Sequence, residues 1–440
     1  MEAITMNTEP NGLLGAVMAA EGIGGMKAMI NGPGGCRSRT QILVKEFVRE
    51  YAGEELGCCS SKYYSRQSKL PCTYLNEDDM IHGSANKIED GLESVLSVSD
   101  TNAVLIDTLG ASLQVTDEDG IVQRSSFRGR VVSTNRRLSS LSFYEGFDDT
   151  VRRIIEHIAP YHKDIVAGSI NVLGYNITDI GWEYGRKEIS DLLCSVGAEF
   201  VSFIGCGCSK EEVLRSGRAE LNVVLHPEFA MGTAEYYQKE FGTPYIVPEM
   251  GAPIGYNSII YFLKEVSAEM RTDPEGPIGV VGSEKNTVSR LVMNTDKIAN
   301  DLRGCGMSIT GTPSDIFPIT EWMHSYLSLV PEHVKILGDQ NSIHARKLKN
   351  FLKKIDCLES LNADGEGQYK VIFTDGMTAK NRKATNTGAS FVEISMPYSF
   401  GTSFINRSLI GTYGCRYILD EIINGYGLFV CGQPTMADLR

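Results

Sequence analysis

Residues 26–39 read Met26-Lys27-Ala28-Met29-Ile30-Asn31-Gly32-Pro33-Gly34-Gly35-Cys36-Arg37-Ser38-Arg39. The run begins as a short apolar strand, passes through a turn rich in glycine and proline, and places Cys36 where the next helix begins. Free backbone N–H groups and the positive end of a helix dipole lie beside a thiol at such a junction. Together with Arg37 and Arg39, they favour the thiolate form of Cys36.

A second cysteine, Cys72, precedes an acidic segment and a helical pattern from Asn86 to Leu96. We take Cys36 and Cys72 as a candidate metal-ligand pair. The alternative is that both are small buried hydrophobic residues, as most free cysteines are. Cys58 and Cys59 lie in a polar loop and are weaker candidate ligands, because adjacent cysteines rarely both bind one metal ion.

Length, charge and cysteine content limit the class of protein. The chain has 440 residues, 42% of them hydrophobic, which is enough for two or three cores. A formal net charge of −13 argues against nucleic acid or an anionic membrane as a partner. Eleven cysteines are too few for a disulfide scaffold and fit a reducing compartment.

The apolar segment from Leu13 to Ile30 contains Glu21 and Lys27, and no basic segment precedes it. We therefore expect a buried helix and strand here, not a signal peptide or a membrane span. We expect a cytoplasmic protein with no membrane partner.

Short apolar strands alternate with helical patterns along the chain, which predicts an α/β fold of parallel sheets covered on both faces. A polar stretch near residue 160 and a Pro-containing linker at 272–277 divide the chain into 1–163, 164–273 and 274–440. The expected strands are 26–30, 102–107, 128–133, 169–174, 199–204, 221–225, 245–247, 278–282, 334–337, 369–373 and 391–394. A helix near 413–423 is expected to close the third region.

A second group of candidate ligands follows the expected strand 199–204. Gly205-Cys206-Gly207-Cys208 stands where ligands bind in doubly wound sheets, and His226 follows the strand 221–225. The three side chains could converge on one pocket. The alternatives are a tight loop of small residues for Cys206 and Cys208 and a hydrogen-bonded structural role for His226.

The sequence contains no Gly-x-x-x-x-Gly-Lys-Ser/Thr loop, so we expect no ATP hydrolysis by this chain. Gly279-Val280-Val281-Gly282-Ser283 lacks the Gly-x-Gly-x-x-Gly spacing, and we interpret it as a tight turn between a strand and a helix.

The turn that ends in Cys36, together with Cys72 and the motif Glu77-Asp78-Asp79-Met80-Ile81-His82-Gly83, resembles the N-terminal domain of nitrogenase component 1 subunits and their relatives. These relatives include the dark-operative protochlorophyllide and chlorophyllide reductases, the nickel-sirohydrochlorin reductive cyclase, methylthio-alkane reductase and cofactor-assembly scaffolds. Gly411-Thr412-Tyr413-Gly414 resembles a later motif of the family. The resemblance implies three Rossmann-like, doubly wound parallel-sheet domains.

The resemblance also implies that Cys36 and Cys72 bind an iron–sulfur cluster, of the 4Fe–4S type, at a subunit interface. Two thiolates are half of a four-cysteine site, and a two-fold axis supplies the other half. The assembly is then a homodimer, or a heterodimer or heterotetramer with a related subunit. The third cysteine usual in the family is replaced by Thr108-Leu109-Gly110.

At the family's cofactor positions this chain has His226 in place of a cysteine and Leu409-Ile410 in place of a histidine. A nitrogenase-type molybdenum–iron cofactor is therefore not expected. A second metal cofactor on Cys206, Cys208 and His226 stays open.

Two functions follow from the resemblance. In the first, the chain is the catalytic component of an anaerobic two-component oxidoreductase that receives electrons from an ATP-dependent iron–sulfur reductase. Its substrate is a tetrapyrrole, whose carboxylates Arg37 or Arg39 would bind, or a small molecule. In the second, the chain is a non-catalytic scaffold for metallocluster assembly. The sequence identifies no catalytic residue.

Overall fold

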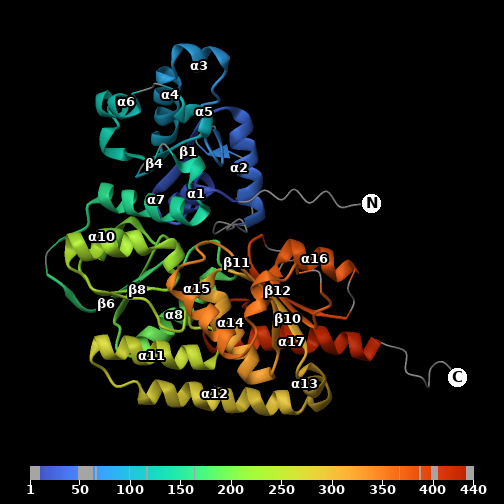
Figure 1. Ribbon diagram of the computed structural model, residues 1–440. Helices are drawn as coiled ribbons and strands as arrows, with labels where there is room; N and C mark the ends of the chain where they lie inside the picture. The colour runs from blue at the N-terminus through green and yellow to red at the C-terminus, as the bar shows by residue number, and fades with distance from the viewer. Residues whose placement is uncertain are drawn as a thin grey trace. The chain divides into compact units, whose positions relative to one another are not determined.

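The computed structural model describes residues 10–47, 63–64, 67–98, 100–114, 117–135, 137–162, 164–365, 367–385, 388–397 and 405–432. The chain forms two compact units (Figure 1). The first comprises 1–164, 202–218 and 229–243, and the second comprises 165–201, 219–228 and 244–440.

The first unit contains a three-stranded sheet in the order β1-β4-β5 and its covering helices. All pairings in this sheet are parallel, and Met26 to Asn31 of β1 align with Asn102 to Asp107 of β4. The strands and helices of the unit are α1 (Gly12–Glu21), β1 (Met26–Asn31), α2 (Gly34–Phe47), β2 (Tyr63–Tyr64), β3 (Gln67–Ser68), α3 (Glu77–His82), α4 (Ala85–Leu96), β4 (Asn102–Asp107), α5 (Leu109–Ser112), α6 (Glu118–Arg124), β5 (Val131–Ser133), α7 (Phe143–Ile158), α9 (Lys210–Ser216) and α10 (Met231–Phe241).

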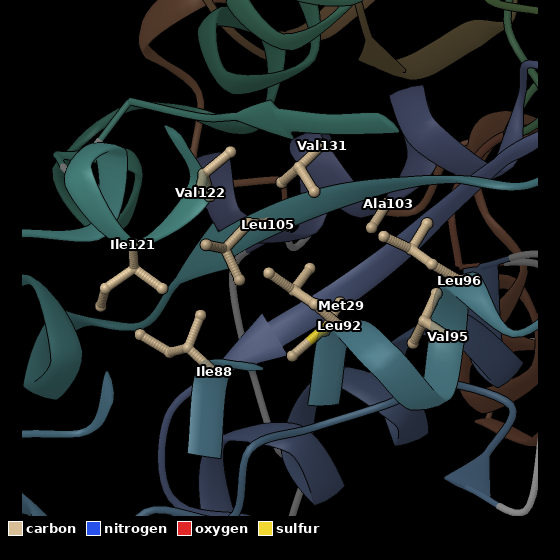
Figure 2. Close-up of a cluster of buried hydrophobic side chains, with 10 residues drawn as sticks. All are labelled: Met29, Ile88, Leu92, Val95, Leu96, Ala103, Leu105, Ile121, Val122 and Val131. Atoms are coloured by element: carbon tan, nitrogen blue, oxygen red, sulfur yellow. The ribbon is translucent and has the colours of Figure 1, made fainter. Parts of the chain in front are cut away.

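Apolar residues from both faces of this sheet build the core of the first unit. Helix α1 is buried along nearly its whole length and packs beside α7 (Figure 1). On the other face, α4 and α6 cover the sheet, and Figure 2 shows their side chains pointing toward those of the strands. This cluster consists of Met29, Ile88, Leu92, Val95, Leu96, Ala103, Leu105, Ile121, Val122 and Val131. The core therefore holds β1 and its C-terminal turn in a fixed place.

Two four-stranded sheets follow, in the orders β7-β6-β8-β9 and β11-β10-β12-β13. Strand β7 (Phe200–Ile204) crosses the boundary between the units. The remaining elements are β6 (Val166–Leu173), α8 (Trp182–Ser195), β8 (Ala219–Val224), β9 (Tyr245–Ile246), α11 (Tyr256–Met270), α12 (Glu275–Met293), α13 (Asp296–Leu302), β10 (Gly306–Gly311), α14 (Pro313–Leu327), β11 (Val330–Ile336), α15 (Ile343–Lys354), β12 (Val371–Asp375), α16 (Gly376–Thr385), β13 (Ser390–Ser395) and α17 (Gly411–Gly432).

The predicted α/β class with three parallel-strand sheets is confirmed. The strand predicted at 278–282 is wrong, and so is the turn at 279–283, because both lie inside α12. A short apolar run fits a strand or a helix, and here the buried Val281 and Val288, seven residues apart, lie on one helical face. The sequence interpretation also missed β10. The boundaries at 163/164 and 273/274 stay a prediction.

Among the described residues, no helix is both long enough and apolar enough to cross a bilayer.

Candidate functional site

The first candidate site lies where β1 ends. Strand β1 stops at Asn31, and α2 begins three residues later, so Cys36 is the third residue of this helix. The Cys36 side chain is exposed, and its backbone N–H donates to the Pro33 carbonyl at 3.1 Å. The predicted strand–turn–helix presentation of this thiol is confirmed.

Cys72 reaches the same place on an extended segment that pairs with the end of β1. The Ile30 N–H donates to the Pro71 carbonyl at 2.9 Å, and the Thr73 N–H donates to the Ile30 carbonyl at 3.0 Å. Cys72 is 2% exposed, and its thiol donates to the Gly32 carbonyl at 3.2 Å. The Tyr74 N–H donates to the Cys72 sulfur at 3.4 Å.

The Cys36 thiol lies close enough to Cys72 to influence its pKa. Burial raises the pKa of Cys72, while the Tyr74 N–H and the Arg37 guanidinium oppose this rise. The charge of Cys36 raises the pKa of Cys72 further. A metal cation between the thiols would reverse both unfavourable effects, because it stabilises thiolates directly. The donor set therefore fits a soft metal centre.

The other sequence candidates near this site differ in placement. Arg37 is half-buried, and its guanidinium donates to the Leu70 carbonyl at 3.4 Å, whereas Arg39 is exposed. Thr108, where the family's third cysteine would stand, packs directly against Gly32. Cys58 and Cys59 lie outside the described residues.

Within the described part of the chain, no group of three or more His, Cys, Asp or Glu side chains is arranged to hold a metal ion. In the described residues, Cys36 and Cys72 therefore form a pair of possible metal ligands and not part of a larger group.

The second candidate site surrounds His226 in the second unit. His226 follows β8, Asp179 follows the neighbouring strand β6, and Asp315 lies in the first turn of α14, which follows β10. His226 Nε2 lies 3.0 Å from Asp315 Oδ1, and His226 Nδ1 lies 3.7 Å from Asp179 Oδ2. Gly174, with a φ of +84°, allows the loop after β6 to approach the His226 backbone, where any Cβ would collide.

Local hydrogen bonds hold the three carboxylates of this cluster. Asp315 accepts from the Thr312 hydroxyl at 2.8 Å, and Asp179 accepts from the Asn176 N–H at 2.8 Å. The third carboxylate, Glu228, accepts from the Ser314 N–H at 3.0 Å, at the N-terminus of α14. A helix N-terminus stabilises negative charge, so α14 favours Glu228 and Asp315 in this place.

Burial acts to lower the pKa of His226, but the carboxylates of Asp315 and Asp179 outweigh it and raise this pKa. Burial raises the pKa of Asp179, and the nearby Asp315 adds to that rise while His226 opposes it. Burial likewise raises the pKa of Glu228. His226 is therefore a protonated partner of carboxylates, and both of its ring nitrogens face them.

Cys206 and Cys208 belong to the first unit, whereas His226 belongs to the second. Both cysteines are buried in the loop after β7, where the Gly24 N–H donates to the Cys208 carbonyl at 2.6 Å and the Gly207 N–H donates to the Gly22 carbonyl at 2.7 Å. These hydrogen bonds hold residues 205–208 as a tight loop against residues 22–24. A shared site of Cys206, Cys208 and His226 stays a prediction.

Sequence reasoning missed Asp179, Asp315 and Glu228. The available signal was positional, because Asp179 and Asp315 follow strands of parallel sheets at the edge where ligand sites form. Nothing in the sequence paired either residue with His226, since 89 residues separate His226 from Asp315.

A family profile described as "Nitrogenase component 1 type Oxidoreductase" matches residues 12–426. The chain therefore belongs to this family of oxidoreductases.

One subunit of the light-independent protochlorophyllide reductase from Methylobacterium sp. (strain 4-46) is 29% identical over 127 residues, which cover 29% of this chain and 24% of that protein. The same subunit from Halorhodospira halophila (strain DSM 244 / SL1) is 38% identical over 80 residues, 18% of this chain and 15% of that protein. The chain thus matches about a quarter or less of the length of these curated relatives.

A solved structure titled "Nitrogenase Cp1 at pH 6.5" has a TM-score of 0.76 and 14% identity, and the match covers 100% of this chain and 97% of that one. "Nitrogenase Cp1 at pH 5" has a TM-score of 0.65 at 14% identity, over 97% of this chain and 90% of that one. At this identity the likeness shows the fold alone.

Proposed function

We propose that this chain is the catalytic component of a two-component oxidoreductase, in which Cys36 and Cys72 bind an iron–sulfur cluster shared with a second subunit. The observation that carries the proposal is the placement of both thiols at the end of β1: Cys36 lies in the first turn of α2, just after the strand, and Cys72 pairs with Ile30 of the strand. Iron–sulfur clusters are held by cysteine thiolates, usually four, and they supply one-electron transfer when bound.

Each residue near the pair has a distinct role in this proposal. Cys36 presents an exposed thiol from the α2 N-terminus, and Cys72 presents a buried one. The Tyr74 N–H and Arg37 favour the thiolate form of Cys72. Two donors per chain leave room for two donors from a partner, so we propose a homodimer or a pairing with a related subunit.

The surface around the pair supports such a partner. Large apolar side chains are exposed before α3, on α3, at the start of α5 and just after it: Tyr74, Met80, Ile81, Leu109 and Leu113. Gln114 joins α3 to the end of α5, since its amide donates to the Asp79 carbonyl at 2.9 Å and contacts the Met80 sulfur at 3.1 Å. Large apolar side chains exposed on neighbouring elements indicate a protein–protein interface.

The proposed electron donor is a separate ATP-dependent iron–sulfur reductase, because the sequence carries no phosphate-binding loop of its own. For the substrate we propose a tetrapyrrole, since two of the relatives are named as subunits of a protochlorophyllide reductase. The alternatives are a small molecule reduced at a second metal cofactor on Cys206, Cys208 and His226, and a scaffold function without turnover.

The first test is the metal content of cysteine variants. We expect Cys36→Ala and Cys72→Ala each to lose the cluster and to weaken the dimer, because each removes one of the two proposed donors in the described part of the chain. Iron and sulfide are quantified anaerobically, with electron paramagnetic resonance as the spectroscopic measurement. Cys194→Ala is the matched control, since Cys194 is an exposed cysteine on α8. Unchanged iron in both ligand variants would refute the proposed site.

The second test concerns electron delivery. Reduction of the cluster is expected to require both the partner reductase and ATP, and to fail with a reductase whose nucleotide site is disabled. Turnover of the tetrapyrrole by the complete system supports catalysis, whereas a cluster that is reduced without any turnover supports the scaffold function. Full turnover with a simple ferredoxin and no ATP would place the protein outside the two-component class.

A further inference from the structure

A buried chain of hydrogen bonds lies directly behind Cys72. Asn31, the last residue of β1, donates from Nδ2 to Asp107 Oδ1 at 2.9 Å and to Glu118 Oε1 at 3.0 Å. The Thr73 hydroxyl donates to Asn31 Oδ1 at 3.0 Å and accepts from the Gly32 N–H at 2.9 Å. The four side chains, Asn31, Thr73, Asp107 and Glu118, are between 0% and 6% exposed.

The carboxyl groups of Asp107 and Glu118 determine the donor and the acceptor in each of these hydrogen bonds. An asparagine amide has a donor end and an acceptor end, and Asp107 and Glu118 both need a donor. They therefore hold the Asn31 amide nitrogen toward themselves and its oxygen toward Thr73. The Thr73 hydroxyl must then donate to Asn31, which leaves its oxygen free to accept from Gly32.

These hydrogen bonds hold the segment that carries Cys72 against the end of β1. The Thr73 side chain engages the Gly32 N–H, and the Leu75 N–H donates to the Gly32 carbonyl at 3.0 Å. On the other side of Cys72, the Pro71 carbonyl accepts from Ile30 at 2.9 Å. The main chain is thus held on both sides of the thiol.

We propose that Asn31 and Thr73 are positioning residues for Cys72: anchored on Asp107 and Glu118, they hold its segment against Gly32 so that the sulfur is placed for metal binding. This inference rests on the proposed function, because it assigns residues that support the proposed ligand. Such supporting hydrogen bonds fix the orientation of a ligand and so slow its dissociation from the metal.

Thr73 offers a matched pair of substitutions for the test. Thr73→Val keeps the shape of the side chain but leaves Asn31 Oδ1 and the Gly32 N–H without their partner, whereas Thr73→Ser keeps the hydroxyl. We expect the Val variant to lose iron to a chelator on the order of 10- to 100-fold faster than the wild type. The Ser variant is expected to resemble the wild type. The rate is followed by iron release, together with the electron paramagnetic resonance line shape of the cluster.

A second measurement does not depend on the cluster. In the protein stripped of iron, hydrogen exchange of the peptide containing residues 70–76 is expected to be faster in Thr73→Val than in Thr73→Ser, because the clamp on Gly32 is lost. Equal iron-release rates, line shapes and exchange rates in the two variants would overturn the inference.

The outcomes separate the inference from the function on which it rests. If Cys72→Ala loses iron while Thr73→Val behaves as the wild type, the proposed function stands and the positioning role is wrong. If the wild-type protein binds no iron, the proposed function is wrong and the inference is overturned with it.

Discussion

The Cys36–Cys72 site and the His226 cluster both stand where strands of parallel sheets end, yet their electrostatics differ. At the first site the charge of Cys36 adds to the burial that raises the pKa of Cys72, and Arg37 and Lys87 oppose only part of that rise. At the second site, His226 supplies the positive charge that Asp315 and Asp179 need. At the first site part of the unfavourable effect on Cys72 remains, whereas the second site is largely complete in itself.

This difference bears on which group can hold a metal. A histidine binds metal through a neutral ring nitrogen, whereas His226 faces a carboxylate with each nitrogen and has a raised pKa. Cys36 keeps an exposed thiol. We therefore expect His226 to form an ion pair, and the cysteine pair remains the better metal candidate.

The largest change in stability is expected when the ion pair between His226 and Asp315 is broken. Asp315→Ala leaves a protonated His226 in a buried position, so we expect the free energy of unfolding to fall by about 3–5 kcal/mol. Iron bound at Cys36 and Cys72 is expected to be retained at a temperature where the variant is folded. Thermal unfolding and iron content are the measurements. Glu240→Ala, which removes an exposed pair with Lys239, is the control and is expected to change stability by less than about 1 kcal/mol.

A parallel loss of iron in Asp315→Ala, with Glu240→Ala unaffected, would show that the two sites are not independent. The His226 cluster and the Cys36–Cys72 site would then be coupled parts of one functional centre.

The next effect is the pH dependence of the His226 cluster. Because the pKa of His226 is raised from 6.5 to about 10, its stabilising contribution is fully present below pH 6.5 and is lost as the pH rises toward 10. His226→Gln removes the charge but can still bond to Asp315, and it is expected to cost about 1–3 kcal/mol near pH 6.5. The difference in melting temperature from the wild type should shrink steadily up to pH 10.

The groups around His226 define the control. Asp315, Asp179, Glu228 and His344 all act on it or on each other. Burial lowers the pKa of His344 to about 4, so His344 is neutral throughout the range from pH 6.5 to 10. The stability difference for His344→Gln should therefore stay constant over that range. A constant difference for His226→Gln as well would contradict the assigned charge.

Local patterns predicted the strand, the turn and the helix start around Cys36 well. The apolar run that ends at Asn31, the glycine and proline turn and the start of α2 all follow from the order of residues over 26–36, and the structure confirms them. The run Ile278 to Gly282 was ambiguous, because five residues are too few to distinguish the periodicity of a strand from that of a helix. Its identity as part of α12 depends on packing against α11 and α17, which sequence spacing does not reveal.

The His226 cluster lay beyond local patterns. Asp179 comes from the loop after β6 and Asp315 from the first turn of α14, and only the tertiary fold brings them together at His226. The same holds for Asn31, whose bonds to Asp107 and Glu118 span 76 and 87 residues. The resemblance to the family supplied the cluster hypothesis, but it gave no indication of these supporting contacts.

The smallest change in stability is expected at Cys208, a buried thiol that belongs neither to the Cys36–Cys72 site nor to the His226 cluster. Cys208→Ala removes one buried sulfur but keeps the backbone bond from Gly24, so we expect a stability loss of about 1 kcal/mol and full iron content. Cys194→Ala, at an exposed position, should change stability by less than about 0.5 kcal/mol. Both are measured by thermal unfolding and anaerobic iron analysis.

The result for Cys208 decides how many metal-binding regions the chain has. Iron lost from Cys208→Ala but retained in Cys194→Ala would support a second metal site on the Cys206–Cys208 loop, because a merely packed sulfur has no influence on metal content. Iron retained in both variants, with the small stability loss confined to Cys208→Ala, is the expected result. It would remove Cys208 from the candidate ligands and leave Cys36 and Cys72 as the thiols proposed for metal binding.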